Sequence, residues 1–212
     1  MAMALIIFGT GPSSRYSTDI AEALEIKISG YLDDNRPAGE LIGGYPVIGS
    51  FDVARDSNYL DQYEFLVPIG DQRLRAKIGD QIIESGGRLA TLVHPTCVVA
   101  KDVNLGKGTV VNALSYLHAG CILGDHVIVE NHVSVGVDNR LGDGVQVAPG
   151  CSINYGVKIE DYCMIGSGAT LNPRVTVGGG SVIGAGATVV SDIPRNKVAV
   201  GVPAKVIKDV QR

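Results

Sequence analysis

The sequence predicts two domains: an α/β, Rossmann-like domain over residues 1–90, and a left-handed parallel β-helix of hexapeptide repeats over residues 91–212. Three observations support this fold class. Residues 4–84 show alternating strand and helix patterns, an aliphatic residue recurs at every sixth position from Val93 onward, and the chain has 28 glycines but no tryptophan. Frequent glycines with few aromatic residues are typical of a core built from stacked repeats of Val, Ile and Leu.

The charge and hydropathy of the chain argue against two classes of partner, nucleic acids and membranes. The chain has a formal net charge of −4 and no Lys/Arg cluster, which argues against a nucleic-acid partner. No apolar run approaches the roughly 20 residues that cross a bilayer, and the N-terminus shows no basic segment with a cleavage site. We therefore expect a cytoplasmic protein with neither a nucleic-acid nor a membrane partner.

The first ninety residues alternate between two patterns. Buried-strand patterns occupy residues 4–8, 26–32 and 65–70, and a turn–strand–turn pattern occupies residues 44–49. Helical patterns occupy residues 18–24 and 72–84. This alternation predicts a parallel sheet with a ligand crevice at the carboxyl ends of its strands.

Two loops at that edge carry candidate ligand residues. Gly9-x-Gly11 begins like a dinucleotide-binding loop, but Ser14 stands where a third glycine belongs and Pro12 stiffens the turn. Backbone amides that hold the phosphate of a different nucleotide are the better interpretation. The acids at positions 33 and 34 follow the second strand. They can bind a sugar or a base, or can be solvated loop acids, and we favour the ligand role.

The C-terminal domain is predicted from seventeen consecutive hexads without an insertion. Each hexad fits a short strand with one large and one small inward side chain, followed by a corner. Three hexads close a triangular coil of 18 residues, and coils stack about 4.8 Å apart. The large inward positions are Val93, Val99, Leu105, Val111, Leu117, Leu123, Val129, Val135, Leu141, Val147, Ile153, Ile159, Ile165, Leu171, Val177, Ile183 and Val189.

The fifth position of each hexad is small or β-branched, with Asn139 as the polar exception. All four cysteines fall at this position, namely Cys97, Cys121, Cys151 and Cys163. They are therefore predicted as buried apolar side chains, with neither a disulfide framework nor a metal site. The second position is often glycine.

These motifs together resemble the bacterial sugar acyltransferases related to sialic-acid O-acetyltransferase and to nucleotide-amino-sugar N-acetyltransferases, within the hexapeptide-repeat superfamily. The similarity covers almost the whole chain. It rests on the hexads and on residues 7–11, 30–34, 69–71, 93–95 and the tail at 200–205.

The resemblance implies transfer of an acetyl or related acyl group from acyl-CoA to the amine of a nucleotide-linked deoxyamino sugar, for glycan or surface-polysaccharide biosynthesis. It also implies a homotrimer, with acetyl-CoA or another acyl-CoA as co-substrate in the groove between neighbouring solenoids, and no metal. By matching motifs, the substrate would bind at Gly11, Pro12, Ser13, Asp33, Asp34 and Gly70, and the acyl-CoA at Gln146, Ser167 and Ala185.

The chain departs from the family at the expected catalytic position. Members of the family carry a histidine at the third position of the eighth hexad, where it acts as general base on the acceptor. Counted from Val93, that position is Val137; it is followed by Asp138, and Asn139 replaces an inward cysteine of the relatives. A second histidine that contacts CoA in relatives is Gln146 here.

Three residues are candidates for a displaced base. His118 lies one coil earlier on the same face, 18 residues before Gly136, and His132 lies at the preceding corner. Asp138, oriented by Asn139, is the third candidate. Each also has an ordinary structural interpretation: the histidines as solvated surface residues, and the aspartate as a corner residue bonded to backbone.

Two further interpretations need no protein base. A sugar amine bound in its neutral form can attack the thioester if the site positions it and backbone N–H groups stabilise the oxyanion, which favours N-acylation over a sugar O-acetyltransferase. Alternatively, the chain is a non-catalytic nucleotide-sugar-binding trimer. The changed residues at positions 137 and 146 support that alternative.

Overall fold

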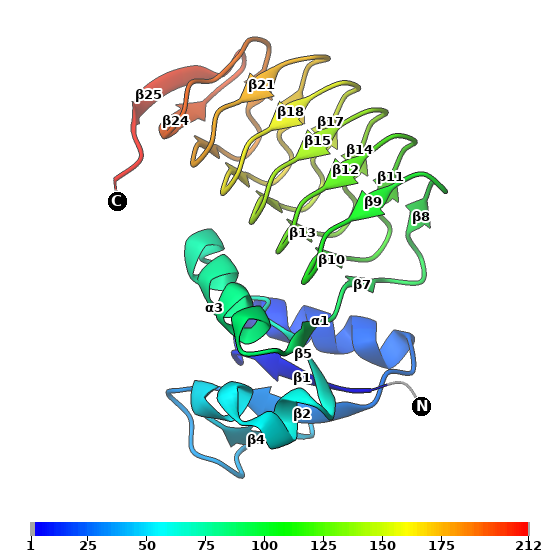
Figure 1. The fold of residues 1–212 in the computed structure, drawn as a ribbon. Helices are drawn as coiled ribbons and strands as arrows, with labels where there is room; N and C mark the ends of the chain where they lie inside the picture. The colour runs from blue at the N-terminus through cyan, green and yellow to red at the C-terminus, as the bar shows by residue number, and fades with distance from the viewer. Residues whose placement is uncertain (1–2, 212) are drawn as a thin grey trace.

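The structure is a computed structural model in which residues 3–211 are described. A twisted sheet flanked by helices forms the N-terminal part, and a three-sided solenoid forms the C-terminal part (Figure 1). Helix α3 lies between the sheet and the solenoid, so the helix contributes to both parts (Figure 1).

The N-terminal sheet has six strands in the order β3-β4-β2-β1-β5-β6. All neighbouring pairs are parallel except β3–β4. The strands are β1 (Ala4–Phe8), β2 (Ile28–Leu32), β3 (Leu41–Ile42), β4 (Tyr45–Gly49), β5 (Tyr63–Leu66) and β6 (Arg88–Leu89). The helices are α1 (Pro12–Ala23), η1 (Phe51–Arg55), α2 (Ser57–Leu60) and α3 (Gln72–Glu84).

The predicted parallel sheet is confirmed, but the first helix begins earlier than expected. It was predicted over residues 18–24 and instead starts at Pro12, with Gly11 as its extended N-cap residue. Proline is well suited to the first helical position because its missing N–H has no helical partner there and its φ is already helical. What was interpreted as a stiffened loop is therefore the first turn of α1.

The solenoid strands β7 to β23 form three parallel sheets, which we call faces 1, 2 and 3. Face 1 contains β7 (Leu92–Val93), β10 (Val110–Val111), β13 (Ile128–Val129), β16 (Gln146–Val147), β19 (Met164–Ile165) and β22 (Val182–Ile183). Face 2 contains β8 (Val98–Val99), β11 (Tyr116–Leu117), β14 (Ser134–Val135), β17 (Ser152–Ile153), β20 (Thr170–Leu171) and β23 (Thr188–Val189). Face 3 contains β9 (Asn104–Leu105), β12 (Ile122–Leu123), β15 (Arg140–Leu141), β18 (Lys158–Ile159) and β21 (Thr176–Val177).

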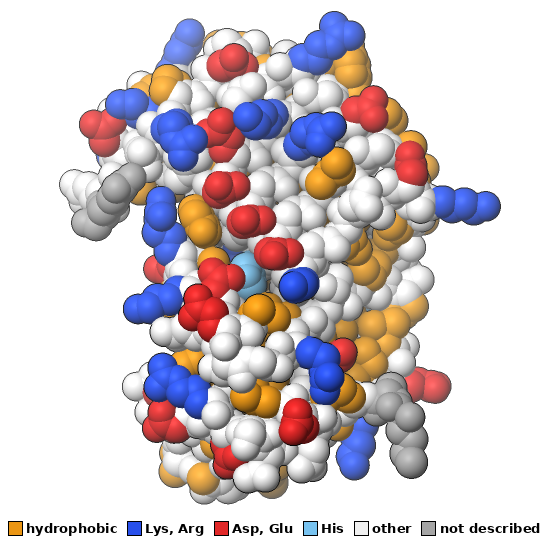
Figure 2. All heavy atoms as spheres, in the orientation of Figure 1, with side chains coloured by type: hydrophobic (Ala, Val, Ile, Leu, Met, Phe, Trp, Pro, Cys, Tyr) orange, Lys and Arg blue, Asp and Glu red, His pale blue; other side chains and the backbone are white. Residues whose placement is uncertain are grey.

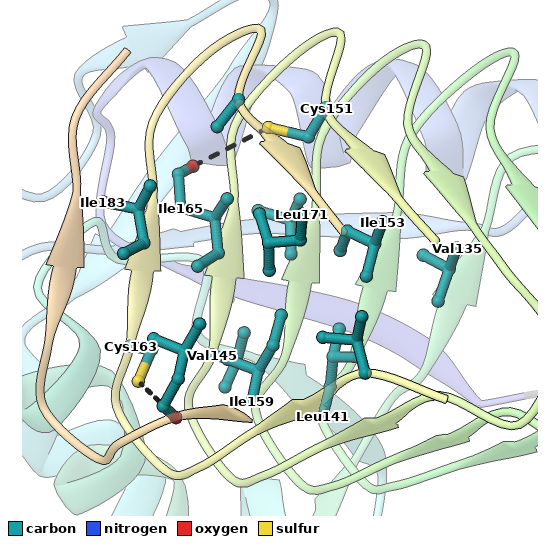
Figure 3. Packing of buried hydrophobic residues seen from close by; sticks show 14 of the residues in the cluster. Val135, Leu141, Val145, Cys151, Ile153, Ile159, Cys163, Ile165, Leu171 and Ile183 are labelled. Carbon is teal, nitrogen blue, oxygen red and sulfur yellow. Dashed lines mark hydrogen bonds between the residues drawn. The ribbon is translucent and has the colours of Figure 1, made fainter. Parts of the chain in front are cut away.

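The hexad register is confirmed. Each of these strands ends on a predicted large inward residue, and each pairs with the strand 18 residues away, as in Val111 with Val129 and Leu117 with Val135. The aliphatic side chains stack in columns inside the prism (Figure 3), and the chain winds as a left-handed β-helix. A strand of two residues has no stability alone, so each coil depends on its neighbours.

The inward small positions behave as predicted, with one difference. Cys121, Cys151 and Cys163 are buried, whereas Cys97, in the first coil, is half-buried because no coil precedes it. The cysteines are free thiols, and the sulfur of Cys163 lies 3.3 Å from the carbonyl oxygen of Gly178 (Figure 3). Desolvation by burial raises the pKa of the Cys163 thiol to about 11.

The three faces of the prism meet at three corners. Corner A joins faces 1 and 2 and includes residues 130–132, corner B joins faces 2 and 3 and includes residues 136–138, and corner C joins faces 3 and 1 and includes residues 142–144. Every sixth residue from Gly108 to Gly186 has a positive φ at its corner. Glycine at the second hexad position has a steric cause, because a Cβ on Gly136 would lie 2.8 Å from the carbonyl oxygen of Ile153 in the next coil.

The two ends of the solenoid are covered differently. At the C-terminal end, β24 (Lys197–Val200) pairs with β22, and β25 (Lys205–Asp209) pairs antiparallel with β24. At the other end, Leu92 and Val110 of face 1 join the apolar core of the N-terminal part, which includes Leu5 and Ile7. Within residues 3–211, none of the helices has the length and apolar character needed to cross a membrane.

Candidate functional site

The carboxyl ends of β1 and β2 and the loop after β5 open onto a cavity of about 480 Å³. All six residues predicted to bind the substrate line this cavity, although they come from three separate segments. They are Gly11, Pro12, Ser13, Asp33, Asp34 and Gly70. The structure therefore brings the predicted substrate residues together at one place, at the edge of the sheet where the sequence located the crevice.

The first turn of α1 forms one wall of the cavity. Gly11 is the N-cap residue, so no side chain caps the first turn. Pro12 and Ser13 follow at the positive end of the helix dipole. Because amide groups and the helix dipole both favour negative charge, this wall suits a phosphate group. Gly9, which precedes it, has φ +84°, a conformation that side-chain-bearing residues rarely adopt.

The aspartate loop is held by an ordered set of hydrogen bonds. Asp33 Oδ2 accepts from the hydroxyl of Thr10 (2.7 Å), and the same hydroxyl oxygen accepts from Nε of Arg36 (3.0 Å). Asp33 Oδ1 accepts from the backbone N–H of Asn35 (2.9 Å). Asp34 accepts from the backbone N–H of Phe51 (2.8 Å). Both acids are therefore fixed in place rather than free in solvent.

Thr10 and Arg36 were missed at the sequence level. Thr10 lies between two conspicuous glycines, and Arg36 lies in a charged loop with no motif of its own. An apolar wall of the cavity was also missed, because Ile69, Leu74 and Ile78 were not among the predicted site residues. These side chains give the cavity an apolar side, which suits the flat face of a nucleobase.

Arg75 connects this cavity to the solenoid. Its side chain on α3 is 1% exposed, and its guanidinium donates to the carbonyl oxygens of Ile69 (2.5 Å), His126 (2.8 Å) and Gly144 (2.8 Å). Ile69 lines the cavity, whereas His126 and Gly144 lie at corner C in successive coils. Desolvation by burial lowers the pKa of Arg75 to about 10, which leaves the group charged at neutral pH.

A second contact between α3 and corner C involves His126. Its Nε2 lies 3.2 Å from Oδ1 of Asp80, and its ring packs directly on Gly79, where a Cβ would lie 2.2 Å from Cε1. A ladder of three aspartates, Asp125, Asp143 and Asp161, runs along the same corner, each accepting from a backbone N–H of the preceding coil. Figure 2 shows acidic side chains in a row over this part of the solenoid.

The three candidate bases lie on two different corners. His118 and Asp138 are on corner B with Val137, and His132 is on corner A. The ring of His118 stacks on Tyr116, with ring centroids 3.8 Å apart. Asp138 and His132 are exposed. Within one chain face 2 separates the two corners, so the structure does not bring the three candidates together.

The expectation that Asn139 orients Asp138 is wrong. Asn139 is 0% exposed and points into the prism, where its Nδ2 donates to the carbonyl oxygen of Ile153 (3.3 Å) and its Oδ1 accepts from the N–H of Val157 (2.7 Å). The fifth hexad position faces inward, whereas Asp138 lies on the outward corner. The polar break at position 139 therefore satisfies backbone groups inside the prism.

The three residues predicted to contact acyl-CoA lie on face 1 and corner A. Ser167 and Ala185 are exposed on corner A in successive coils, where the N–H of Gly186 donates to the carbonyl oxygen of Ser167. Gln146 is on face 1 and is 8% exposed. Its Oε1 is buried and has no hydrogen-bond partner among the described residues.

A buried glutamate beside Gln146 was not found from the sequence. Glu130, at corner A, is 7% exposed; its Oε2 accepts from Nδ2 of Asn112 (3.2 Å) and its Oε1 from Nε2 of Gln146 (3.5 Å). Desolvation by burial raises the pKa of the Glu130 carboxyl, against the lowering effect of Gln146 and of the Arg75 charge. Among the described residues there is no group of three or more His, Cys, Asp and Glu arranged to hold a metal ion.

Comparison with known proteins agrees with this architecture. Residues 4–82 match the family model described as the PglD N-terminal domain, and residues 140–173 and 156–191 match the bacterial transferase hexapeptide (six repeats). A GDP-perosamine N-acetyltransferase of Escherichia coli O157:H7 is 30% identical over 117 residues. That match covers 55% of this chain and 52% of the relative, so it spans about half the length of the curated protein.

Solved structures match over the whole chain. A perosamine N-acetyltransferase variant from Caulobacter crescentus, in complex with CoA and GDP-perosamine, is similar with a TM-score of 0.94 and 30% identity over 99% of both chains. The acetyltransferase domain of PglB from Neisseria gonorrhoeae FA1090, in complex with acetyl coenzyme A, has a TM-score of 0.91 and 32% identity, over 98% of this chain and 100% of the other. This chain therefore belongs to the nucleotide-amino-sugar N-acetyltransferases of the hexapeptide-repeat superfamily.

Proposed function

We propose that the protein transfers an acetyl group, or a related acyl group, from acyl-CoA to the amine of a nucleotide-linked deoxyamino sugar. The observation that carries this proposal is the cavity at the sheet edge, where a helix N-terminus, two fixed aspartates and an apolar wall meet. These features suit a phosphate, a hydroxyl-bearing sugar and a flat base in turn. The related structures with CoA and GDP-perosamine support the substrate class.

In this proposal, Gly11, Pro12 and Ser13 hold the phosphate end of the substrate, and Asp33 and Asp34 accept from hydroxyl or base N–H groups. Gly70 lies beside the sugar, since a Cβ there would meet no atom within 4 Å and the backbone is open to a ligand. Gln146, Ser167 and Ala185 line the acyl-CoA channel along face 1 and corner A. We also propose that the protein is cytoplasmic.

The reaction joins the sugar nitrogen to the acyl carbon. The amine nitrogen attacks the thioester carbonyl carbon, the C–S bond breaks, and the nitrogen loses a proton while the sulfur leaves as a thiol. A neutral amine is a much better nucleophile than a sugar hydroxyl, which needs a base from the outset. The absence of a histidine at position 137 therefore favours N-acylation over O-acylation.

We propose a homotrimer as the working form. Exposed apolar side chains gather on face 2 and its two corners: Val98, Leu114, Tyr116, Val137 and Tyr155 are each 41–57% exposed. Figure 2 shows hydrophobic side chains on the side of the solenoid where β8, β11 and β14 lie. Packing corner A of one copy against corner B of the next would cover them and would bring His132 near His118 and Asp138. A stable monomer in light scattering contradicts this arrangement.

The test is a panel of UDP-, dTDP- and GDP-linked 4-amino sugars with acetyl-CoA, measuring free thiol and the mass of the product. Matched sugars that carry a hydroxyl in place of the amine distinguish N- from O-acylation. Thiol release that requires the amine supports the proposal. The absence of thiol with every sugar, together with no CoA binding by calorimetry, would favour the alternative of a non-catalytic nucleotide-sugar-binding trimer.

A further inference from the structure

Glu130 is an unusual residue for a buried position on the outside of the solenoid. Its side chain is 7% exposed, and the ion pairs among the described residues do not include it. Arg75 is near enough to attract it, but the guanidinium donates its hydrogen bonds to three backbone carbonyl groups. A buried carboxylate without an ion-pair partner destabilises a fold, so its presence calls for another explanation.

The neighbours of Glu130 orient it as an acceptor. Asn112 Nδ2 and Gln146 Nε2 donate to its two carboxyl oxygens, and both donors are themselves buried. Asn112 is fixed in turn, because the same Nδ2 group donates to the carbonyl oxygen of Val129 at 3.1 Å. Since each oxygen has a second lone pair, each still has room for one more donor.

The cluster also has an unfilled position. Gln146 Oε1 is buried and unpaired among residues 3–211, so a hydrogen-bond donor is missing beside the carboxyl group. A buried acceptor without a donor costs about 1–3 kcal/mol. An N–H group of a ligand, such as a protonated amine or an amide, would satisfy Gln146 and reach Glu130 at the same time.

We propose that Glu130 is the general base of acyl transfer, accepting the proton of the acceptor amine that the chain cannot give to a histidine at position 137. This inference rests on the proposed function and names its catalytic residue. As the C–N bond forms and the C–S bond breaks, the proton on nitrogen moves to the Glu130 carboxylate. The departing sulfur then takes that proton, which regenerates the carboxylate and yields the amide and the free thiol.

The surroundings fit this task. Burial raises the pKa of the carboxyl above that of an ordinary glutamate, which makes its carboxylate form a stronger base. Arg75 from α3 is the charged group that acts on it from the N-terminal part, and its attraction limits the rise. Exposed Ser167 and Ala185 lie on the same corner as Glu130, further along the solenoid.

Glu130→Gln tests the proposal with little change of volume. We expect the turnover number to fall roughly 10²-fold, with CoA binding by calorimetry nearly unchanged and no fall in the unfolding midpoint. Wild-type turnover should fall at acid pH as Glu130 is protonated. This fall, the acid limb of the pH–rate profile, should be absent in Glu130→Gln. Glu130→Asp keeps the carboxyl group and should retain the limb at reduced rate. Glu84→Gln, an exposed glutamate of α3, is the matched control.

Two further variants separate a catalytic from a structural role. Gln146→Leu removes a donor that lowers the pKa of Glu130, so the acid limb should move to higher pH. In the proposed trimer, corner B of one copy faces corner A of the next, so Val137→His in the Glu130→Gln background should restore much of the lost turnover, which a purely structural role does not allow. If Glu130→Gln turns over as fast as the wild type and keeps the same loss of activity at acid pH, Glu130 is not the base, and the proposed function stands without it. An inactive wild type overturns the proposed function and this inference together.

Discussion

Nη2 of Arg75 lies 2.8 Å from the carbonyl oxygen of Gly144, although 69 residues separate them in the chain. The same guanidinium donates to the carbonyl oxygens of Ile69, at the cavity by the sheet edge, and of His126, one coil earlier. This side chain thus links the loop after β5 to two successive coils of the solenoid.

Arg75→Met should lower the free energy of unfolding by about 3 kcal/mol, because three buried carbonyl groups lose their donor. We also expect weaker nucleotide binding, since the loop at Ile69 is released, whereas CoA binding should be retained. Urea unfolding and calorimetry measure the two effects. Lys77→Met, an exposed cation on the same helix, is the control; equal stability of the two variants contradicts the role given to Arg75.

Gly79→Ala should destabilise the protein by about 1 kcal/mol, although alanine normally stabilises a helix by a similar amount relative to glycine. The cause is the His126 ring, which occupies the space that the new methyl group needs. A double-mutant cycle with His126→Ala checks it, because removing the ring should make Gly79→Ala neutral or stabilising. Additive effects would show that the contact is not the cause.

Thr10→Val removes the donor to Asp33 and the acceptor for Arg36 with little change of shape. We expect the dissociation constant of the nucleotide sugar to rise roughly tenfold, about 1.4 kcal/mol, with that of CoA unchanged. Calorimetry provides both values. Thr91→Val, which removes a hydroxyl bonded to Gly106 at the solenoid entrance, should leave both constants as in the wild type.

The four thiols should differ in reactivity. Burial raises the pKa of Cys163 to about 11, and that of the half-buried Cys97 is also raised, chiefly by desolvation. Because the thiolate reacts, we expect a disulfide reagent at pH 8 to label Cys97 first and Cys163 only on unfolding. Mass spectrometry of tryptic peptides identifies the labelled sites, and all four should react quickly in denaturant. Early labelling of Cys163 would mean that the last coils open.

Glu130 should make stability depend on pH. Its pKa is raised in the folded protein above the ordinary value of 4.5, so the folded state holds this proton more tightly than the unfolded state. The favourable contribution is therefore complete below the unfolded pKa and is lost as pH rises through the folded pKa. In urea unfolding from pH 4 to 8, the free energy of unfolding of Glu130→Gln should increase relative to that of the wild type as pH rises. A constant difference between the two contradicts the raised pKa.

The solenoid could be predicted almost completely from the sequence, because its register depends on one repeated choice. An aliphatic residue at every sixth position must face inward, and the strand that carries it can pair only with the strand 18 residues away. The predicted helix over residues 72–84 and the parallel sheet are likewise local patterns. The predicted start of the first helix was wrong because Gly11-Pro12 was interpreted as a loop rather than as the N-terminus of α1.

The interior polar contacts could not be predicted in the same way. Arg75 occupies an ordinary position in an amphipathic helix, and its burial depends on carbonyl groups 51 and 69 residues away. Glu130 and Gln146 lie in different coils, at corner A and on face 1, and meet only because their outward side chains turn toward each other. A polar residue at an outward hexad position is normally solvated, so the sequence alone gives no sign of this cluster.

The guanidinium of Arg75 binds carbonyl groups in two successive coils, and this has a consequence for how such chains can vary in length. An 18-residue insertion between His126 and Gly144 would separate those carbonyls by one more coil, about 4.8 Å, and break the contact. The same insertion after Tyr162 would leave both carbonyl groups in their present coils. Added coils beyond that point therefore keep the contact that Arg75 makes with the solenoid.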